Sequence, residues 1–185
     1  MNNWEEHGIN DVSNFVGFLY EPNSKTLIAH FNKNIGQGYG IKSLWARHLS
    51  DDTYGRITPA RGYFSYEDAV ISQNSEVYVN VLEIKIKNGA YDGYEWNSIM
   101  KINLKTKEMV ELVNKNDISI SPPFSKIWIS TIHSISLDSK EIYCSIAHQG
   151  KSNIEDSIKT EYYLSKFLVD DGRYERITKL GANIL

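Results

Sequence analysis

One pattern of short strands and turns occurs three times in this chain of 185 residues, and it restricts the possible folds more than any other feature. The third copy, Ser134 to Leu180, is the clearest. It consists of a polar turn, the apolar run Ile142 to Ile146, a polar loop, the alternating run Tyr162 to Val169, a second turn and a last short run. Runs of this length between turn residues are typical of β-strands. Each copy therefore predicts a four-stranded antiparallel meander.

The spacing of equivalent apolar residues supports the repeat. Leu27, Val77 and Ile142 begin the second strand of the three copies, 50 and 65 residues apart. A leucine ends each third strand, and an apolar residue of the fourth strand follows it after 8, 8 and 9 residues: Leu49 and Ile57, Leu104 and Leu112, Leu168 and Ile177. Four-stranded repeats of roughly 40 to 50 residues indicate propeller blades.

These observations predict an all-β fold in a single domain over residues 1–185. Three consecutive four-stranded antiparallel meanders, at approximately 12–62, 66–116 and 128–180, form a partial, open β-propeller-like domain. The long run from Val77 to Ile86 changes phase: the valines at 77, 79 and 81 share one face, whereas the apolar residues at 82, 84 and 86 share the other. This change predicts a β-bulge near its middle.

Three segments resemble blades of a known fold family. The segments LSDDTYGRIT (Leu49 to Thr58) and LVDDGRYERIT (Leu168 to Thr178) resemble the outer hairpin of TolB-type, WD40-like β-propeller blades. The segment SLDSKEIYCSIA (Ser136 to Ala147) is similar to that family's strand, turn and strand. The chain departs from the family's Ser-Pro-Asp-Gly-type turn, with Asp138-Ser139-Lys140, Asn74-Ser75-Glu76 and Asn23-Ser24-Lys25 in its place. The resemblance covers roughly residues 12–180 and implies a fold, but no catalytic residue.

Three repeats are fewer than a closed ring needs, because propellers typically have four to eight blades. Two sheet faces therefore stay uncovered, and three arrangements could cover them. The chain could dimerise into a larger ring, the N-terminal arm and the tail Gly181 to Leu185 could complete a small fourth element, or a partner protein could cover the open side. We favour an open wedge of three sheets that needs a partner or a second copy.

Composition and charge restrict the classes of molecule that this protein is expected to bind. The net charge of −3, without a basic block, argues against nucleic acid and suits a basic protein partner such as a toxin or an enzyme. No run approaches the 18 apolar residues of a membrane span, and the segment Met1 to Asp11 lacks the apolar region of a signal peptide. We therefore expect a cytoplasmic protein with no membrane partner. The single cysteine, Cys144, is expected to be a small buried hydrophobic residue.

Candidate partner-binding residues lie in three segments predicted as long loops: Lys33 to Gly40, Asn88 to Glu95 and Gln149 to Glu161. Loops on a rigid scaffold often carry function, and a mixture of Tyr, Gly and Asn is typical of protein-binding loops. The alternative is that the tyrosine rings only cap the ends of the sheets. The predicted contact residues are Tyr39, Tyr91, Tyr94, Trp96, His148, Glu155 and Asp156.

Motifs of enzyme chemistry are weak. The glycines at 36, 38 and 40 are followed by an alternating strand pattern and not by the helix that a phosphate-binding loop needs. The five histidines are scattered, without the spacing of a zinc site, and no G-x-S-x-G nucleophile motif occurs. We predict no catalytic residue, metal or cofactor.

The predicted function is a non-catalytic protein-binding module, such as an inhibitor or immunity-type protein that blocks a toxin or enzyme. Two alternatives stay open. One is a carbohydrate- or peptide-processing enzyme, because the resemblance implies blades that also occur in lyases and peptidases. The other is a ligand-binding propeller formed by dimerisation.

Overall fold

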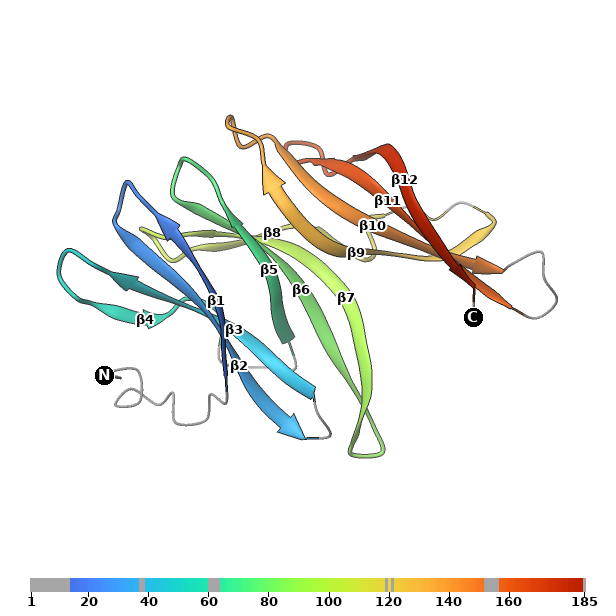
Figure 1. Cartoon of the computed structure of the whole chain (residues 1–185), viewed down its shortest axis with the longest axis horizontal. Helices are drawn as coiled ribbons and strands as arrows, with labels where there is room; N and C mark the ends of the chain where they lie inside the picture. The colour runs from blue at the N-terminus through green and yellow to red at the C-terminus, as the bar shows by residue number, and fades with distance from the viewer. Residues whose placement is uncertain are drawn as a thin grey trace.

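Three four-stranded antiparallel sheets follow one another along the chain (Figure 1). The computed structural model describes residues 14–36, 39–59, 64–118, 120, 122–151 and 157–184, which contain twelve strands and no helix. No helix long and apolar enough to cross a bilayer therefore occurs in these residues. The first sheet contains β1 (Asn14–Glu21), β2 (Thr26–Gly36), β3 (Tyr39–His48) and β4 (Tyr54–Arg56); the second contains β5 (Phe64–Ile71), β6 (Glu76–Lys87), β7 (Ala90–Asn103) and β8 (Met109–Asn114); the third contains β9 (Phe124–Ile135), β10 (Glu141–Lys151), β11 (Ile158–Leu168) and β12 (Tyr174–Ile184).

The strands of every sheet are ordered as in the sequence, so each sheet is the predicted meander. The second sheet lies between the other two, and the order of the three sheets is that of consecutive propeller blades (Figure 1). The fold prediction is confirmed. The first sheet has an exposed outer face, on which Val16, Phe18 and Tyr20 alternate along β1. The tail from Gly181 to Ile184 continues β12, so in the described residues it extends the third sheet and forms no fourth element.

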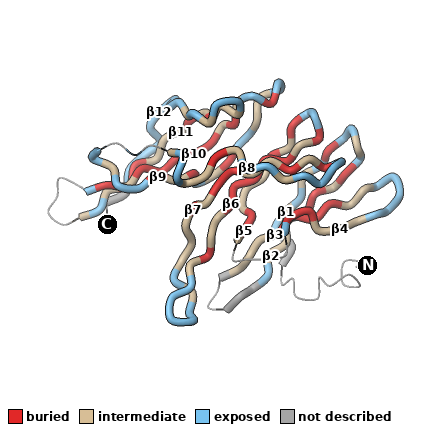
Figure 2. The backbone as a smooth tube through the Cα atoms, turned by 180° about the vertical axis from the view of Figure 1, so that it is seen from behind, coloured by how far each residue is buried: buried red, intermediate tan, exposed pale blue. Residues whose placement is uncertain are grey.

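Two apolar cores hold the sheets together. One core, between the first and second sheets, contains Ile28, Leu44, Val77, Val79 and Val81. The other, between the second and third sheets, contains Tyr78, Ile99, Ile146 and the fully buried Cys144. The second sheet is thus buried on both faces, and Figure 2 shows its buried backbone in the middle of the molecule.

The predicted bulge occurs at the expected level, but on the neighbouring strand. The pairing of β6 with β7 shifts between Val81 and Leu82, and the extra residue is Asn97 of β7. Because of it, Trp96 and Ile99 face the same core although they are three positions apart, an offset that places side chains on opposite faces of a regular strand. β6 keeps its regular alternation. Both of its faces are apolar because both are covered by another sheet.

The three predicted loops are shorter than expected, which corrects the sequence analysis. β2 extends to Gly36 and β3 begins at Tyr39. In the second sheet only Asn88 and Gly89 connect β6 to β7, with φ angles of 53° and 76° that suit an Asn-Gly hairpin turn. In the third sheet β10 continues to Lys151 and β11 begins at Ile158. The glycines and tyrosines of these segments lie mostly on the strands of long hairpins. Glycine within a strand often marks a β-bulge, and Gly93 lies beside such a bulge in β7.

The turn between the first and second strands has the same backbone shape in every sheet. Lys25, Ser75 and Ser139 occupy equivalent positions with φ angles of 50°, 61° and 62°. These values lie in the left-handed region, where the family's turn has glycine. In the second and third sheets a serine hydroxyl, of Ser72 or Ser136, accepts hydrogen bonds from the turn's backbone N–H groups. The shared geometry supports the threefold repeat.

Replacing Gly150 with alanine should destabilise the third sheet. A Cβ atom at this position of β10 would lie 2.4 Å from the carbonyl oxygen of Pro123, which is backbone and cannot rotate away. We expect a loss of about 1–3 kcal/mol in the free energy of unfolding, the usual cost of overpacking, measured by urea denaturation. Gly181→Ala is the matched control in the same sheet, because no atom lies within 4 Å of its added Cβ. Equal stabilities of the two variants would contradict this prediction.

Candidate binding groove between the second and third sheets

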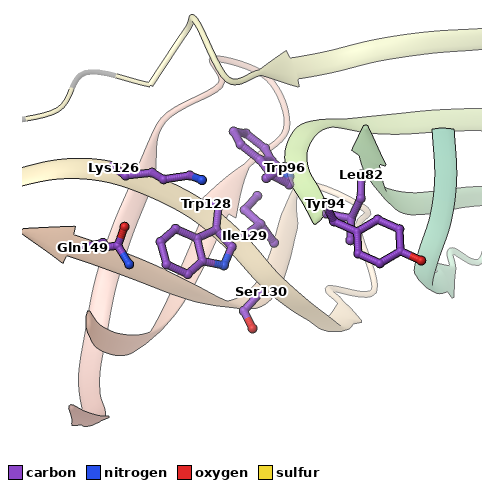
Figure 3. A pocket seen from close by; sticks show the side chains of 8 residues that line it. All are labelled: Leu82, Tyr94, Trp96, Lys126, Trp128, Ile129, Ser130 and Gln149. Atoms are coloured by element: carbon purple, nitrogen blue, oxygen red, sulfur yellow. The ribbon is translucent and has the colours of Figure 1, made fainter. Parts of the chain in front are cut away.

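A pocket of about 340 Å³ lies between the second and third sheets, and we call it the aromatic groove (Figure 3). One wall comes from β6 and β7 of the second sheet. The other comes from β9 and β10 of the third. The lining residues are Leu82, Tyr94 and Trp96 on the first wall, and Lys126, Trp128, Ile129, Ser130 and Gln149 on the second.

Trp96 is a fixed wall of the groove. Its side chain is buried, because the bulge at Asn97 turns it into the core beside Leu82. Its indole Nε1 donates a hydrogen bond of 2.9 Å to Asn80 Oδ1, and Asn80 Nδ2 donates one of 3.2 Å to the carbonyl oxygen of Ile129. This chain of hydrogen bonds joins β7, β6 and β9. It fixes the width of the groove by tying the two sheets together at this level.

Trp128 forms the accessible part of the groove. Trp128 lies between the buried Ile127 and Ile129 on β9; it is half-buried and packs against the edge of the core between the second and third sheets. Its partner across the sheet is the small residue Ala147. Lys126, two residues earlier, places its Nζ 5.7 Å from the centre of the Trp128 ring, within the range of a cation–π contact. The result is a flat aromatic surface with a positive charge beside it.

Tyr94 connects the groove to the first sheet. Its hydroxyl donates a hydrogen bond of 2.6 Å to the carbonyl oxygen of Gly40 on β3. In Figure 3 this hydroxyl points away from Trp128, while the ring stays at the rim of the groove. The Tyr91 ring lies 5.3 Å from the Tyr94 ring in an edge-to-face arrangement. Burial raises the pKa of Tyr94, so its hydroxyl keeps its proton at neutral pH.

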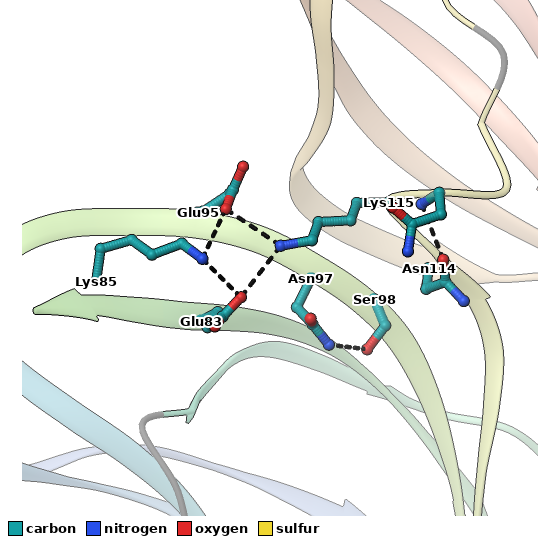
Figure 4. A network of polar contacts seen from close by, with 8 residues as sticks. Glu83, Lys85, Glu95, Asn97, Ser98, Asn114 and Lys115 are labelled. Carbon is teal, nitrogen blue, oxygen red and sulfur yellow. Dashed lines mark hydrogen bonds and ion pairs between the residues drawn. The ribbon is translucent and has the colours of Figure 1, made fainter.

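A charge-balanced network stiffens the β6–β7 hairpin next to the groove (Figure 4). Glu83 and Glu95 pair across the two strands, and each carboxylate contacts both Lys85, at 2.9 Å, and Lys115, at 3.1 or 3.2 Å. Hydrogen bonds from Lys85 and Lys115 lower the pKa of both carboxyls. Two positive and two negative charges cancel, so the network adds no net charge near Trp96.

His148 lies inside the third sheet and not in the groove. Its side chain is fully buried, with the rings of Phe124 and Tyr163 centred 5.0 and 5.1 Å away. Arg176 Nη2 lies 3.2 Å from His148 Nδ1. A guanidinium can only donate, so Nδ1 accepts and Nε2 carries the proton of the neutral ring. Burial, assisted by the charge of Arg176, lowers the pKa of His148 to about 4.

The structure brings together only part of the predicted contact set. Tyr94 and Trp96 line the groove, and Tyr91 contacts Tyr94 farther along the hairpin. Tyr39 is the first residue of β3. Glu155 and Asp156 lie outside the described residues.

Sequence reasoning missed the opposite wall of the groove, Lys126, Trp128, Ser130 and Gln149. One signal was available in the sequence. A tryptophan stands between two isoleucines in the run Ile127-Trp128-Ile129, so one of these large apolar side chains had to face away from the core.

A second hollow, of about 450 Å³, lies among the turns of the third sheet. Three of its four acidic side chains already have partners in the protein: Asp138 accepts from Ser136, Glu141 pairs with Lys166, and Asp171 pairs with Arg173, and Asp170 is the fourth. Within the described residues, no group of three or more His, Cys, Asp or Glu side chains is arranged to hold a metal ion. The aromatic groove is therefore the better candidate for a site.

Solved structures of other proteins resemble this chain in fold, although no sequence-based match was found. No protein-family model and no curated protein sequence matches the chain. Among solved structures, a Hadza microbial sialidase matches with a TM-score of 0.63 and 7% identity, over 95% of this chain and 39% of its own. An oligogalacturonate lyase in complex with manganese matches with a TM-score of 0.50 and 12% identity, over 90% and 36%. Prolyl oligopeptidase B from Galerina marginata matches with a TM-score of 0.50 and 11% identity, over 88% and 22%.

These likenesses show a propeller-type fold, which confirms the resemblance at the level of the blade architecture. The chain spans less than two fifths of the length of these three structures. At identities of 7 to 12% these likenesses concern the fold alone, and the activities of these enzymes are not transferred to this chain.

Proposed function

We propose that this chain is a non-catalytic module that binds another protein through the aromatic groove. The observation that carries the proposal is the half-buried Trp128 with Lys126 above it, opposite the rigid wall of Trp96. Tryptophan and tyrosine are enriched at the energetic centres of protein interfaces, in partly closed pockets of this kind. Hydrogen-bonded strands form both walls, so little conformational entropy is lost when a partner is bound.

The form of binding that we propose is inhibitory, as in an immunity-type protein that blocks a toxin or enzyme. A preformed groove on rigid strands supports tight, stoichiometric binding, which such a role requires. The net charge of −3 is too small to select a partner by long-range attraction. Recognition therefore depends on the local chemistry of the groove.

The chemistry of the lining residues supports binding over catalysis. General acid–base catalysis needs positioned groups whose pKa values lie near the working pH. Of the eight lining residues, only Lys126 is charged at neutral pH, and the Tyr94 hydroxyl is bonded to the carbonyl of Gly40. Trp128, Ser130 and Gln149 can stack or form hydrogen bonds, which is the chemistry of recognition.

Trp128→Ala is expected to reduce capture of a partner strongly. The full chain serves as bait in lysate from its native source, and native mass spectrometry weighs the eluate. The unmodified chain should retain one protein in stoichiometric amount, and Trp128→Ala should weaken this binding by about 30-fold or more, as at interface hot spots. Trp128 is half-buried, so the variant is expected to stay folded.

Tyr20→Ala is the matched control, because Tyr20 is an exposed aromatic residue of the first sheet, away from the groove. This variant should retain the partner. Retention by Trp128→Ala, or loss caused by Tyr20→Ala alone, would contradict the proposal. A dimer without any partner would favour a ligand-binding propeller formed by two copies.

A further inference from the structure

We infer that the aromatic groove selects a partner segment in which a carboxylate lies beside an aromatic or large aliphatic side chain. This inference rests on the proposed function and adds the chemistry of the anchor. It follows from the charges of the lining residues and from the polar groups that these residues leave available.

The groove contains one positive charge and no negative one. Lys126 is the only charged lining residue, and no carboxylate in the described part of the chain forms an ion pair with it. Its side chain instead contacts the Trp128 ring. Several other lysines on the strands pair with carboxylates: Lys42 with Glu67, Lys85 and Lys115 with Glu83 and Glu95, Lys101 with Glu76, Lys159 and Lys179 with Glu161, and Lys166 with Glu141 and Glu175. A carboxylate from outside could therefore bind Lys126 without breaking an existing ion pair.

The rest of the groove is suited to an apolar side chain. Leu82 and Trp128 are half-buried and offer apolar surface to this space, and the buried side chains of Trp96 and Ile129 close it from behind (Figure 3). The volume of about 340 Å³ is at the lower end of the usual range of ligand pockets. One large side chain with its neighbour fits this volume better than a long segment does.

Two polar groups can orient the backbone of the bound segment. Gln149 Nε2 donates to Thr160 Oγ1 at 3.3 Å, whereas no hydrogen bond within the described residues uses Gln149 Oε1. This oxygen can accept from a backbone N–H. The Ser130 hydroxyl is exposed at the rim and can donate to a carbonyl oxygen. Together with Lys126, these groups favour a peptide over a purely apolar ligand.

A direct test uses two probes of the same shape, N-acetyl-phenylalanine, which ends in a carboxylate, and N-acetyl-phenylalaninamide, which ends in a neutral carboxamide. The chain has four tryptophans, and NMR resolves one indole N–H signal for each after assignment with single Trp→Phe variants. The signals of Trp128 and Trp96 report on the groove, and that of Trp45, in the first sheet, is an internal control.

The carboxylate should shift the two groove signals with a dissociation constant on the order of 1 mM, as expected for a small ligand. The amide should bind about 3- to 10-fold more weakly, because it lacks the charge that contacts Lys126. Lys126→Ala should remove this preference, and Lys126→Arg should keep it. Equal binding of the two probes, shifts of the same size at Trp45, or no shift at the groove signals would overturn the inference.

The capture experiment separates this inference from the proposed function. Lys126→Glu should reduce capture more than Lys126→Ala does, because it places like charges together in the groove. If Trp128→Ala loses the partner and Lys126→Glu retains it in full, the proposed function stands and the acidic anchor is overturned. If the probes show the predicted preference but the chain captures no protein, the chemistry of the groove is supported and the proposed function fails.

Discussion

Trp96→Ala should lower the free energy of unfolding by about 3–5 kcal/mol, the range of large-to-small substitutions in well-packed cores. Trp96 is only 3% exposed and packs in the core between the second and third sheets. The variant also leaves Asn80 Oδ1 without its indole donor, and Asn80 is fully buried. Urea denaturation measures the loss, provided that the m-value is unchanged.

Two further variants separate the loss of apolar packing from the loss of the hydrogen bond to Asn80. Trp96→Phe keeps most of the apolar volume but removes the N–H donor, so a loss of about 1–3 kcal/mol isolates the unpaired oxygen of Asn80. Trp128→Ala should cost less than Trp96→Ala, because Trp128 is half-buried and its indole donates no hydrogen bond to a described residue. Equal losses for Trp96→Ala and Trp128→Ala would contradict the division between a structural wall and a contact surface.

Acid should destabilise the protein between pH 8 and pH 4, through histidines that are buried in the neutral form. The pKa of His148 falls from 6.5 to about 4 on folding, so the unfolded chain binds a proton more readily and stability is lost as the pH falls through this range. At 1.36 kcal/mol for each pH unit, His148 accounts for roughly 2 kcal/mol at pH 5 and roughly 3 kcal/mol at pH 4. The pKa of His30 is also lowered to about 4, chiefly by burial, and acts in the same direction.

His148→Phe should remove the His148 part of this pH dependence. The ring packs between Phe124 and Tyr163, which an aromatic hydrocarbon can also contact. Urea denaturation at pH 8 and pH 5 gives the difference in unfolding free energy, which should shrink by about 2 kcal/mol in the variant. An unchanged difference would contradict the prediction, because it would show that the pKa of His148 is similar in the folded and unfolded states.

Glu161 does not disturb this measurement. Hydrogen bonds from Lys159, Lys179 and Tyr163 lower its pKa to about 2. Its contribution to stability is therefore complete above the unfolded pKa of about 4.5 and is lost only as the pH falls from there toward 2. Burial raises the pKa of Asp68, which acts in the opposite direction, so the comparison with His148→Phe over the interval from pH 8 to pH 5 isolates the contribution of His148.

The difference between the predicted contact residues and the residues that line the aromatic groove has one physical cause. Tyr91, Tyr94 and Trp96 were predicted from a Gly- and Tyr-rich loop, but they lie on β7, which begins directly after an Asn-Gly turn. A side chain on a strand has a fixed face, whereas one in a loop does not. The bulge at Asn97 sends Trp96 into the core, and Tyr94 contacts β3. Whether each of these side chains can contact a partner therefore depends on which face of the strand carries it.

The sequence by itself determined the three meanders and their resemblance to propeller blades. Alternating apolar residues and turn residues act locally, so the strands around Val77 and Ile142 and the turn at Asp138-Ser139 could be recognised without any long-range contact. Only the tertiary structure placed Trp128 and Lys126 opposite Trp96 and buried His148 behind Phe124 and Tyr163. These placements depend on bulges and on the way one twisted sheet packs against the next, and neither leaves a periodic signal in the chain.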